Sequence, residues 1–489
     1  MSDNSKVRTR FAPSPTGYLH LGSIRTALFC YLFAKSKSGQ FVWRLEDTDQ
    51  ERFVSGAEAQ MRQVFDWLGI APDEGPEIGG EFGPYRQSER LKLYQRFAHE
   101  LVDQGLAYYS DLNQAVIEEA KLKAKQDKRS FVFRGEDFDR QLGDNRANVP
   151  IRFRMSKVVG DTVTWKDSIR GEQTVNLSTI EDFILIKSDG YPTYNFANVI
   201  DDHLMQVSDV IRAEEFIAST PKHQLLYQSL GFAVPNFLHL PIVLGEDKKK
   251  LSKRSGASDL MLLKHQGYLP NAIVNYLALL GWNPGSTQEV FSLSQLVAAF
   301  NPKSLQVSPA IYNQERLDWF NTQHLRMLGM QELVEVFKPL IKDYFDPEWE
   351  ASRNFLSNPD DIAYLERILT VEKDKITNPK QYIDKIYFLY RRPKFDQTVL
   401  DRFDLDKADF EVVVERLLAV LESNQDWEKG ELINLVKGFI KSSGLSTKFV
   451  MMSLRASLTS QLGAMGIYDI MVLLGRQESL ARLNQALEE

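Results

Sequence analysis

The chain contains a single cysteine, Cys30, in 489 residues. An internal disulfide and a zinc site built from cysteines are therefore excluded. The sequence also lacks an apolar run long enough to span a bilayer, and its first residues lack the apolar segment of a secretory signal. These absences predict a cytoplasmic protein with no membrane attachment. Cys30 is expected to pack on the apolar side of a predicted helix.

An excess of basic residues is also missing, because the formal net charge is −7 at pH 7. This charge argues against a uniformly basic nucleic-acid-binding protein. It leaves open local basic faces, which decide such binding. The length exceeds what one hydrophobic core usually serves, so we expect roughly three to five domains.

The organisation of the chain depends on residues 7–36. Residues 7–12 have the short, partly alternating pattern of a strand, and the turn PSPTG ends it, because proline removes ladder donors and glycine permits positive φ. Apolar residues then recur at helical spacing. The first turn of this predicted helix carries His20 and Gly22, and its free backbone N–H groups can face an anion.

Acidic side chains follow the second predicted strand, residues 41–45. Glu46 and Asp49 lie where that strand ends, and parallel sheets bind ligands at the carboxyl ends of their strands. The alternative is a polar loop before the next helix. For that helix the sequence predicts a capping box of Ser55 with Glu58.

The basic run KKKLSKR, residues 248–254, has five cationic residues among seven. Such a run is usually a solvated loop or a nonspecific basic patch. Here it follows a predicted strand, and loop lysines can close over a triphosphate and neutralise charge that builds up in a transition state. Together with His20 far upstream, the run indicates a nucleotide site.

Four segments resemble the glutamyl branch of the class I aminoacyl-tRNA synthetases. They are PSPTGYLHLGS at 13–23, GPYRQSERLKLY at 83–94, the block 188–203, and KLSKR at 250–254. The resemblance implies an α/β fold: a Rossmann-type nucleotide-binding domain with an inserted α+β acceptor-binding domain, followed by a stem-contact domain and an all-α anticodon-binding C-terminal half. Helical patterns without a β-barrel pattern beyond residue 331 agree with this.

The same resemblance gives domain boundaries. The catalytic fold is expected in two halves, residues 1–110 and 189–262, with the inserted domain at residues 111–188 between them. The stem-contact domain is expected at residues 263–330, and the two helical anticodon-binding domains at residues 331–378 and 379–489.

The implied activity is the ATP-dependent ligation of L-glutamate to the 3′ end of tRNA(Glu) through a glutamyl-adenylate, with formation of AMP and pyrophosphate. Magnesium is expected on the ATP phosphates, although the sequence shows no dedicated ligands for it. Some family members carry a zinc-binding cysteine cluster where this chain reads Ala107 to Ser110, so we expect no zinc. The resemblance alone suggests a monomer.

Site residues of the family carry over to matching positions here. The catalytic residues would be His20, Lys250, Lys253 and Arg254. ATP would be bound by His20, Gly22, Ser23, Glu215, Lys250 and Lys253. Glutamate would be bound by Arg10, Ala12, Ser14, Glu46, Tyr194, Asn198 and Arg212, with Glu46 on the α-ammonium. The acceptor end of tRNA would meet Asp49 and Arg52.

Substrate choice also has a physical argument. The anionic side chain of glutamate needs a fixed cation, best an arginine fork, and Arg10 and Arg212 both lie at the ends of predicted strands. A glutamine side chain would leave a buried guanidinium unpaired, at a cost of roughly 1–3 kcal/mol. The alternative for each arginine is a structural ion pair.

Two other functions fit parts of the sequence. A glutaminyl-tRNA synthetase is disfavoured by the KLSKR form and by the helical C-terminal half. A non-catalytic tRNA-binding relative is disfavoured by the intact His20, Lys250 and Lys253. Whether tRNA(Gln) is also charged stays open, and no residue is assigned to anticodon reading.

Overall fold

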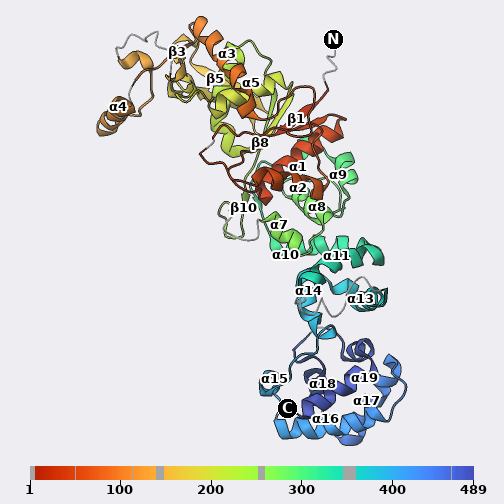
Figure 1. Cartoon of the computed structure of the whole chain (residues 1–489). Helices are drawn as coiled ribbons and strands as arrows, with labels where there is room; N and C mark the ends of the chain where they lie inside the picture. The colour runs from red at the N-terminus through yellow and green to blue at the C-terminus, as the bar shows by residue number, and fades with distance from the viewer. Residues whose placement is uncertain are drawn as a thin grey trace. The chain divides into compact units, whose positions relative to one another are not determined.

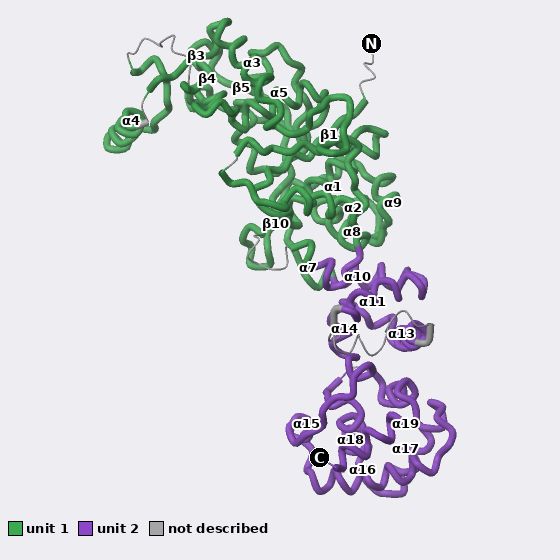
Figure 2. Tube along the Cα trace, viewed as in Figure 1, with its two compact units in different colours: residues 1–262, 270–317 green, residues 263–269, 318–489 purple. Residues whose placement is uncertain are grey.

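A computed structural model describes residues 6–49, 51–112, 114–138, 148–251, 259–344, 359–463 and 465–488. The chain divides into two compact units, Met1–Leu262 with Pro270–Leu317 and Leu263–Leu269 with Asp318–Glu489 (Figure 2). The first unit mixes strands and helices, and the second is helical (Figure 1). This is the fold class that the sequence predicts; its finer domain boundaries stay a prediction.

The first unit is built on a six-stranded sheet. Its spatial order is β2 (Gln40–Trp43), β1 (Arg8–Phe11), β8 (Asp209–Ala213), β9 (Asn236–Leu240), β5 (Thr162–Asp167) and β6 (Gly171–Asn176). The first five strands are parallel to their neighbours, and β6 is antiparallel to β5. In this register Arg212 of β8 lies beside His239 of β9.

Helices cover both faces of this sheet, which is why all residues of β1 and all but one residue in each of β8 and β9 are buried. On one face Phe65 of α2 (Ala57–Leu68) meets the rings of Phe41 and Trp43 edge-on, and Tyr31 of α1 (Leu21–Ser36) also meets Phe41. The opposite face packs with three further helices, α3 (Leu91–Asp103), α5 (Tyr194–Leu204) and α6 (Thr220–Ser229).

The predicted inserted segment contributes to two sheets. A small antiparallel sheet has the order β3 (Ala107–Tyr109), β4 (Ile151–Phe153) and β7 (Ile184–Ile186), and α4 (Gln114–Gln126) lies between β3 and β4 in the chain. The hairpin of β5 and β6 instead extends the central sheet, because Asp167 pairs with Phe237 of β9.

Helices α8 (Pro270–Leu279) and α9 (Leu293–Ala299) and a short strand pair complete the first unit. The pair consists of β10 (Val243–Leu244) and β11 (Ala310–Ile311), which are parallel. Helices α8 and α9 pack against α1. Two unit boundaries fall within α7 (Leu260–His265) and α10 (Gln314–Met327), and the third lies between Leu269 and Pro270.

The second unit has one continuous hydrophobic core shared by its helices. Its further helices are α11 (Met330–Tyr344), α13 (Pro359–Glu372), α14 (Pro379–Ile386), α15 (Gln397–Phe403), α16 (Lys407–Glu422), α17 (Lys429–Ser443), α18 (Thr447–Thr459) and α19 (Ile467–Glu488). The last of these is broken at Gly475, whose φ of 76° and ψ of 169° are not helical.

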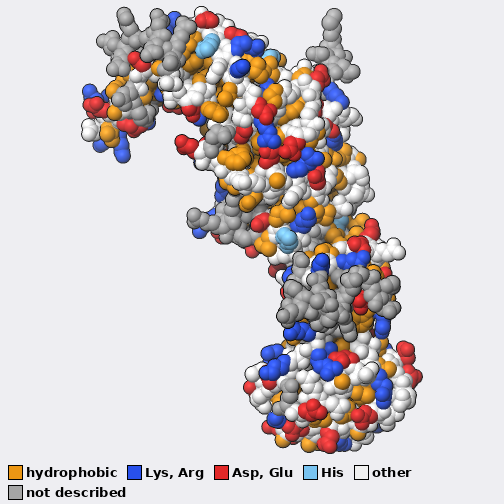
Figure 3. Space-filling view, viewed as in Figure 1, with side chains coloured by type: hydrophobic (Ala, Val, Ile, Leu, Met, Phe, Trp, Pro, Cys, Tyr) orange, Lys and Arg blue, Asp and Glu red, His pale blue; other side chains and the backbone are white. Residues whose placement is uncertain are grey.

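None of the helices in the described ranges is long and apolar enough to cross a membrane. On the face drawn in Figure 3, basic and acidic side chains are interspersed on each unit.

Helix α2 begins differently from the sequence prediction. Its N-cap is Gly56, in the left-handed region with φ of 81°, and no side chain caps it. Glu58 instead forms an ion pair with Arg86. The predicted capping box of Ser55 and Glu58 is therefore wrong, because a guanidinium binds this carboxylate more strongly than a backbone N–H does.

Candidate active site

A cavity of about 420 Å³ lies at the carboxyl ends of β1 and β8. These two neighbouring strands continue in opposite directions, since β1 leads through α1 to β2 while β8 leads through α6 to β9. Such a reversal leaves a crevice between the two connections, where open α/β sheets bind ligands. The topology alone therefore marks this cavity as a candidate site.

Most of the residues predicted for the site meet at this cavity. Those that line it are Arg10, Ala12, Ser14, His20, Gly22, Ser23, Glu46, Tyr194, Asn198, Arg212, Glu215 and Lys250. The two distant segments that carry His20 and Lys250 thus border one space. Lys253 and Arg254 lie outside the described residues.

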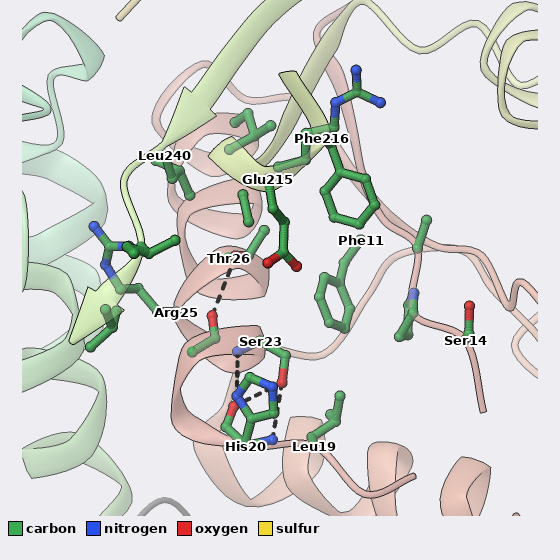
Figure 4. Close-up of a pocket in the computed structure, with 18 of the residues that line it drawn as sticks. Phe11, Ser14, Leu19, His20, Ser23, Arg25, Thr26, Glu215, Phe216 and Leu240 are labelled. Carbon is green, nitrogen blue, oxygen red and sulfur yellow. Dashed lines mark hydrogen bonds between the residues drawn. The ribbon is translucent and has the colours of Figure 1, made fainter. Parts of the chain in front are cut away.

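His20 occupies the N-terminus of α1, where it forms a capping box with Ser23 (Figure 4). Its Nδ1 accepts the backbone N–H of Ser23 at 3.2 Å, and the Ser23 hydroxyl accepts the N–H of His20 at 3.0 Å. Because Nδ1 accepts, the proton of a neutral imidazole lies on Nε2, which makes Nε2 a donor. A Cβ at Gly22 would lie 3.2 Å from two ring atoms of His20, so glycine leaves room for the ring.

Lys250 forms an ion pair with Glu215, which projects from η5 (Glu214–Ser219) with its carboxylate toward the cavity (Figure 4). The Lys250 and Glu215 side chains are 61% and 47% exposed, so water screens the pair and makes it weak. An anion that enters the cavity can therefore take Lys250 from Glu215 at little cost. A backbone bridge between His20 and Asp259 also brings the chain beyond Lys250 to the start of α1.

Arg10 has a counter-ion inside the protein. Its Nε donates to Oδ1 of Asp202 at 2.9 Å, and a terminal nitrogen donates to Oδ1 of Asn198 at 3.2 Å. Burial opposes the charge of Arg10, but the Asp202 carboxylate outweighs burial, and the pKa of Arg10 is raised. The structural ion pair that the sequence left open is thus present for Arg10.

Arg212 is equally buried but has only neutral hydrogen-bond partners. Its guanidinium donates to Nε2 of His239 at 3.0 Å, to the hydroxyls of Tyr194 and Thr220 at 3.2 and 2.9 Å, and lies 3.4 Å from Nδ1 of His223. No ion pair within the described part of the chain includes Arg212, and burial lowers its pKa. A buried cation without a counter-ion is costly, so an anion in the cavity would be bound favourably.

Glu46 places a carboxylate on the same cavity. It is buried, and its Oε1 accepts from Nδ2 of Asn198 at 2.7 Å and from a terminal nitrogen of Arg44 at 3.2 Å. Burial raises the pKa of Glu46, while Arg44 and Arg10 oppose the rise. Both contacts use one oxygen, so the carboxylate is fixed while its second oxygen keeps its acceptor capacity.

Asp49 and Arg52 do not line the cavity. They lie on the surface, where Nε of Arg52 donates to Oδ2 of Asp49 at 2.6 Å and the Arg52 side chain is 74% exposed. This position suits contact with a large partner better than contact with a small substrate.

Sequence reasoning missed two groups of functional interest. Arg25 lines the cavity from within α1 and donates to the carbonyls of Leu280 and Pro241 at 2.6 and 2.8 Å; burial lowers its pKa to about 10. His239 lies behind Arg212 rather than on the cavity. The available signals were weak: one arginine in an apolar helix pattern, and one histidine in an apolar strand.

Comparisons with known proteins give matches over nearly the whole length of this chain. Residues 6–319 match the family described as the catalytic domain of class I tRNA synthetases (E and Q), and residues 332–487 match an anticodon binding domain. The chain is 36% identical to a glutamate–tRNA ligase of Clostridium tetani, over 100% of this chain and 98% of that protein, and 36% identical to one of Thermus thermophilus, over 98% and 100%. A crystal structure of a glutamate tRNA ligase from Elizabethkingia meningosepticum, in complex with its amino acid, superposes with a TM-score of 0.84 at 31% identity and covers 99% of each chain.

Proposed function

The chain belongs to the class I tRNA synthetases for glutamate and glutamine, and we propose that it ligates L-glutamate to tRNA(Glu) at the cavity between His20, Arg212 and Lys250. One observation supports the choice of glutamate most strongly: Arg212 is a buried cation at the cavity that has only neutral partners among the described residues. An anionic side chain supplies the missing charge, and an amide does not.

The reaction has two steps. The α-carboxylate of glutamate attacks the α-phosphorus of ATP, and pyrophosphate leaves. A terminal hydroxyl of tRNA then attacks the acyl carbon of the adenylate, and AMP leaves. In the first step the protein aligns two anions that repel each other and stabilises a more highly charged transition state.

ATP is bound along the start of α1 in this proposal. The Nε2–H of His20 and the remaining N–H groups of the first turn face the phosphates, and Lys250 moves from Glu215 to them. Lys253 and Arg254, assigned by their motif, add positive charge. ATP enters with magnesium on its phosphates.

Glutamate is held at both ends. Its side-chain carboxylate faces Arg212, with Tyr194 beside it, and Arg10, which donates to Asn198, borders the same cavity. Its α-ammonium faces Glu46, whose carboxylate is already oriented by Asn198. Ala12 and Ser14 border the same cavity from the loop after β1 and complete the set of residues proposed for glutamate.

For tRNA we propose that Asp49 and Arg52 meet the acceptor end and that the helical second unit carries the anticodon contacts. Exposed arginine and lysine side chains bind phosphates with an affinity that falls with salt. We also propose that the enzyme acts as a monomer.

The test is aminoacylation of purified tRNA(Glu) and tRNA(Gln) with labelled glutamate or labelled glutamine. Transfer of glutamate to tRNA(Glu) is expected. Transfer of glutamine, or no transfer with either amino acid, would overturn the proposal. Charging of tRNA(Gln) with glutamate would leave the amino acid assignment intact and widen the set of tRNA substrates.

A further inference from the structure

Arg212 is held from behind by His239. Its Nε donates to Nε2 of His239 at 3.0 Å, and the imidazole is fully buried. A guanidinium N–H can only donate, so Nε2 has to be the acceptor. A neutral imidazole carries one proton, which is therefore on Nδ1.

Asp167 fixes that proton. Its Oδ2 lies 2.5 Å from Nδ1 of His239, and its Oδ1 accepts the backbone N–H groups of Ile169 and Arg170, both at 2.9 Å. A carboxylate only accepts, so it selects the tautomer with the proton on Nδ1. Asp167 ends β5 and pairs with Phe237, two residues before His239, which brings the carboxylate to the imidazole.

We propose that Asp167 and His239 are positioning residues for glutamate recognition: Asp167 sets the tautomer of His239, and His239 fixes the plane of the Arg212 guanidinium. This inference rests on the proposed role of Arg212. Neither Asp167 nor His239 lines the cavity, so both act through Arg212.

The arrangement explains how a buried arginine can be oriented without being neutralised by a carboxylate of the protein. A carboxylate bonded directly to Arg212 would neutralise it and compete with the substrate, as Asp202 does for Arg10. An imidazole between the two keeps the direct partner neutral. Burial also lowers the pKa of His239, although Asp167 opposes this shift. The lowered pKa favours the neutral ring.

The decisive variant is Asp167→Asn, which has nearly the same shape. Its amide oxygen can still accept the N–H groups of Ile169 and Arg170, so its NH₂ group faces Nδ1 of His239. The ring then carries its proton on Nε2, where it opposes the Nε–H of Arg212. We expect the KM for glutamate to rise about tenfold to a hundredfold, with the KM for ATP and the melting temperature little changed.

Asp182→Asn is the matched control. Asp182 is also buried and also accepts two backbone N–H groups, of Gly135 and Met155, and one side-chain donor, the Tyr108 hydroxyl. It has no contact with Arg212. This variant should keep the wild-type KM for glutamate.

A double-mutant cycle separates this inference from the proposed function. Arg212→Met alone should raise the KM for glutamate, and Asp167→Asn should add no more than about twofold in that background. If Arg212→Met leaves this KM unchanged, the role of Arg212 fails and the inference with it. If Arg212→Met raises the KM for glutamate but Asp167→Asn alone does not, only the inference is overturned. The same holds if Asp167→Asn raises this KM equally in the wild type and in Arg212→Met. An equal rise in Asp182→Asn would also overturn it.

Discussion

Arg90 donates through Nε to Oδ1 of Asp201 at 2.7 Å, with both side chains buried, whereas Arg212 at similar burial has only neutral partners among the described residues. The two arginines therefore differ in what their removal leaves behind. Loss of Arg90 leaves the buried carboxylate of Asp201 with only the more distant Arg44, at 3.8 Å, but loss of Arg212 leaves no opposite charge behind.

The first prediction compares their effects on stability. Arg90→Ala should cost about 3–5 kcal/mol of unfolding free energy, because Asp201 loses its hydrogen-bonded cation and keeps only the cation of Arg44, at 3.8 Å. Arg212→Ala should cost clearly less, about 1–3 kcal/mol, from neutral partners left unpaired. Denaturant unfolding of the first unit measures both. Equal losses would make Arg212 a structural residue.

The second prediction separates the two roles of His20. His20→Asn keeps a side-chain acceptor that is favourable at an N-cap but removes Nε2, so stability should stay near wild type while kcat falls by about 10²–10³. His20→Ala should lose the same activity and, in addition, about 1 kcal/mol of stability. A wild-type kcat in His20→Asn would exclude the imidazole from catalysis.

The third prediction concerns pH. Burial, followed by the nearby Arg212, lowers the pKa of His223 well below its ordinary value. The unfolded chain therefore binds this proton at a higher pH than the folded one, and the stability that depends on the neutral ring is complete above pH about 6.5 and lost as pH falls. Relative to His223→Gln, the wild type should lose up to about 1.4 kcal/mol per pH unit below that point. Unfolding curves at pH 7.5, 6.5 and 5.5 test this; parallel pH dependences would contradict it.

The fourth prediction tests the surface pair of Asp49 and Arg52. Arg52→Ala should raise the KM for tRNA several-fold and lower the slope of log affinity against log salt by about 1, with stability changed by less than about 0.5 kcal/mol. Arg62→Ala is the control, because Arg62 is also an exposed arginine in an ion pair, with Asp66. If both variants weaken tRNA binding equally, Arg52 has no special place at the acceptor end.

The positions of the site residues along the chain were predictable because strand ends are local features. The turn PSPTG after β1 and the basic run after β10 are legible in the sequence, and the parallel central sheet brings the ends of β1 and β8 to one edge, although β10 pairs with β11 in a separate sheet. The resemblance to a known family then supplied the residues between these landmarks.

The charge balance of the site was not predictable. Arg10 and Arg212 look alike in the sequence, since each lies near the end of a short strand. Only the tertiary structure brings Asp202 to Arg10 and the neutral His239 to Arg212. For the same reason Glu58 was misjudged, because its partner Arg86 comes from a distant loop.

The central claim is that the uncompensated charge of Arg212 selects glutamate. The most direct measurement is the ratio of kcat/KM for glutamate to that for glutamine, in the wild type and in Arg212→Met, with tRNA(Glu) and ATP saturating. We predict a ratio of at least about 10² in the wild type that falls about tenfold or more in the variant, mainly through loss of glutamate use. A ratio that Arg212→Met leaves unchanged would contradict the account.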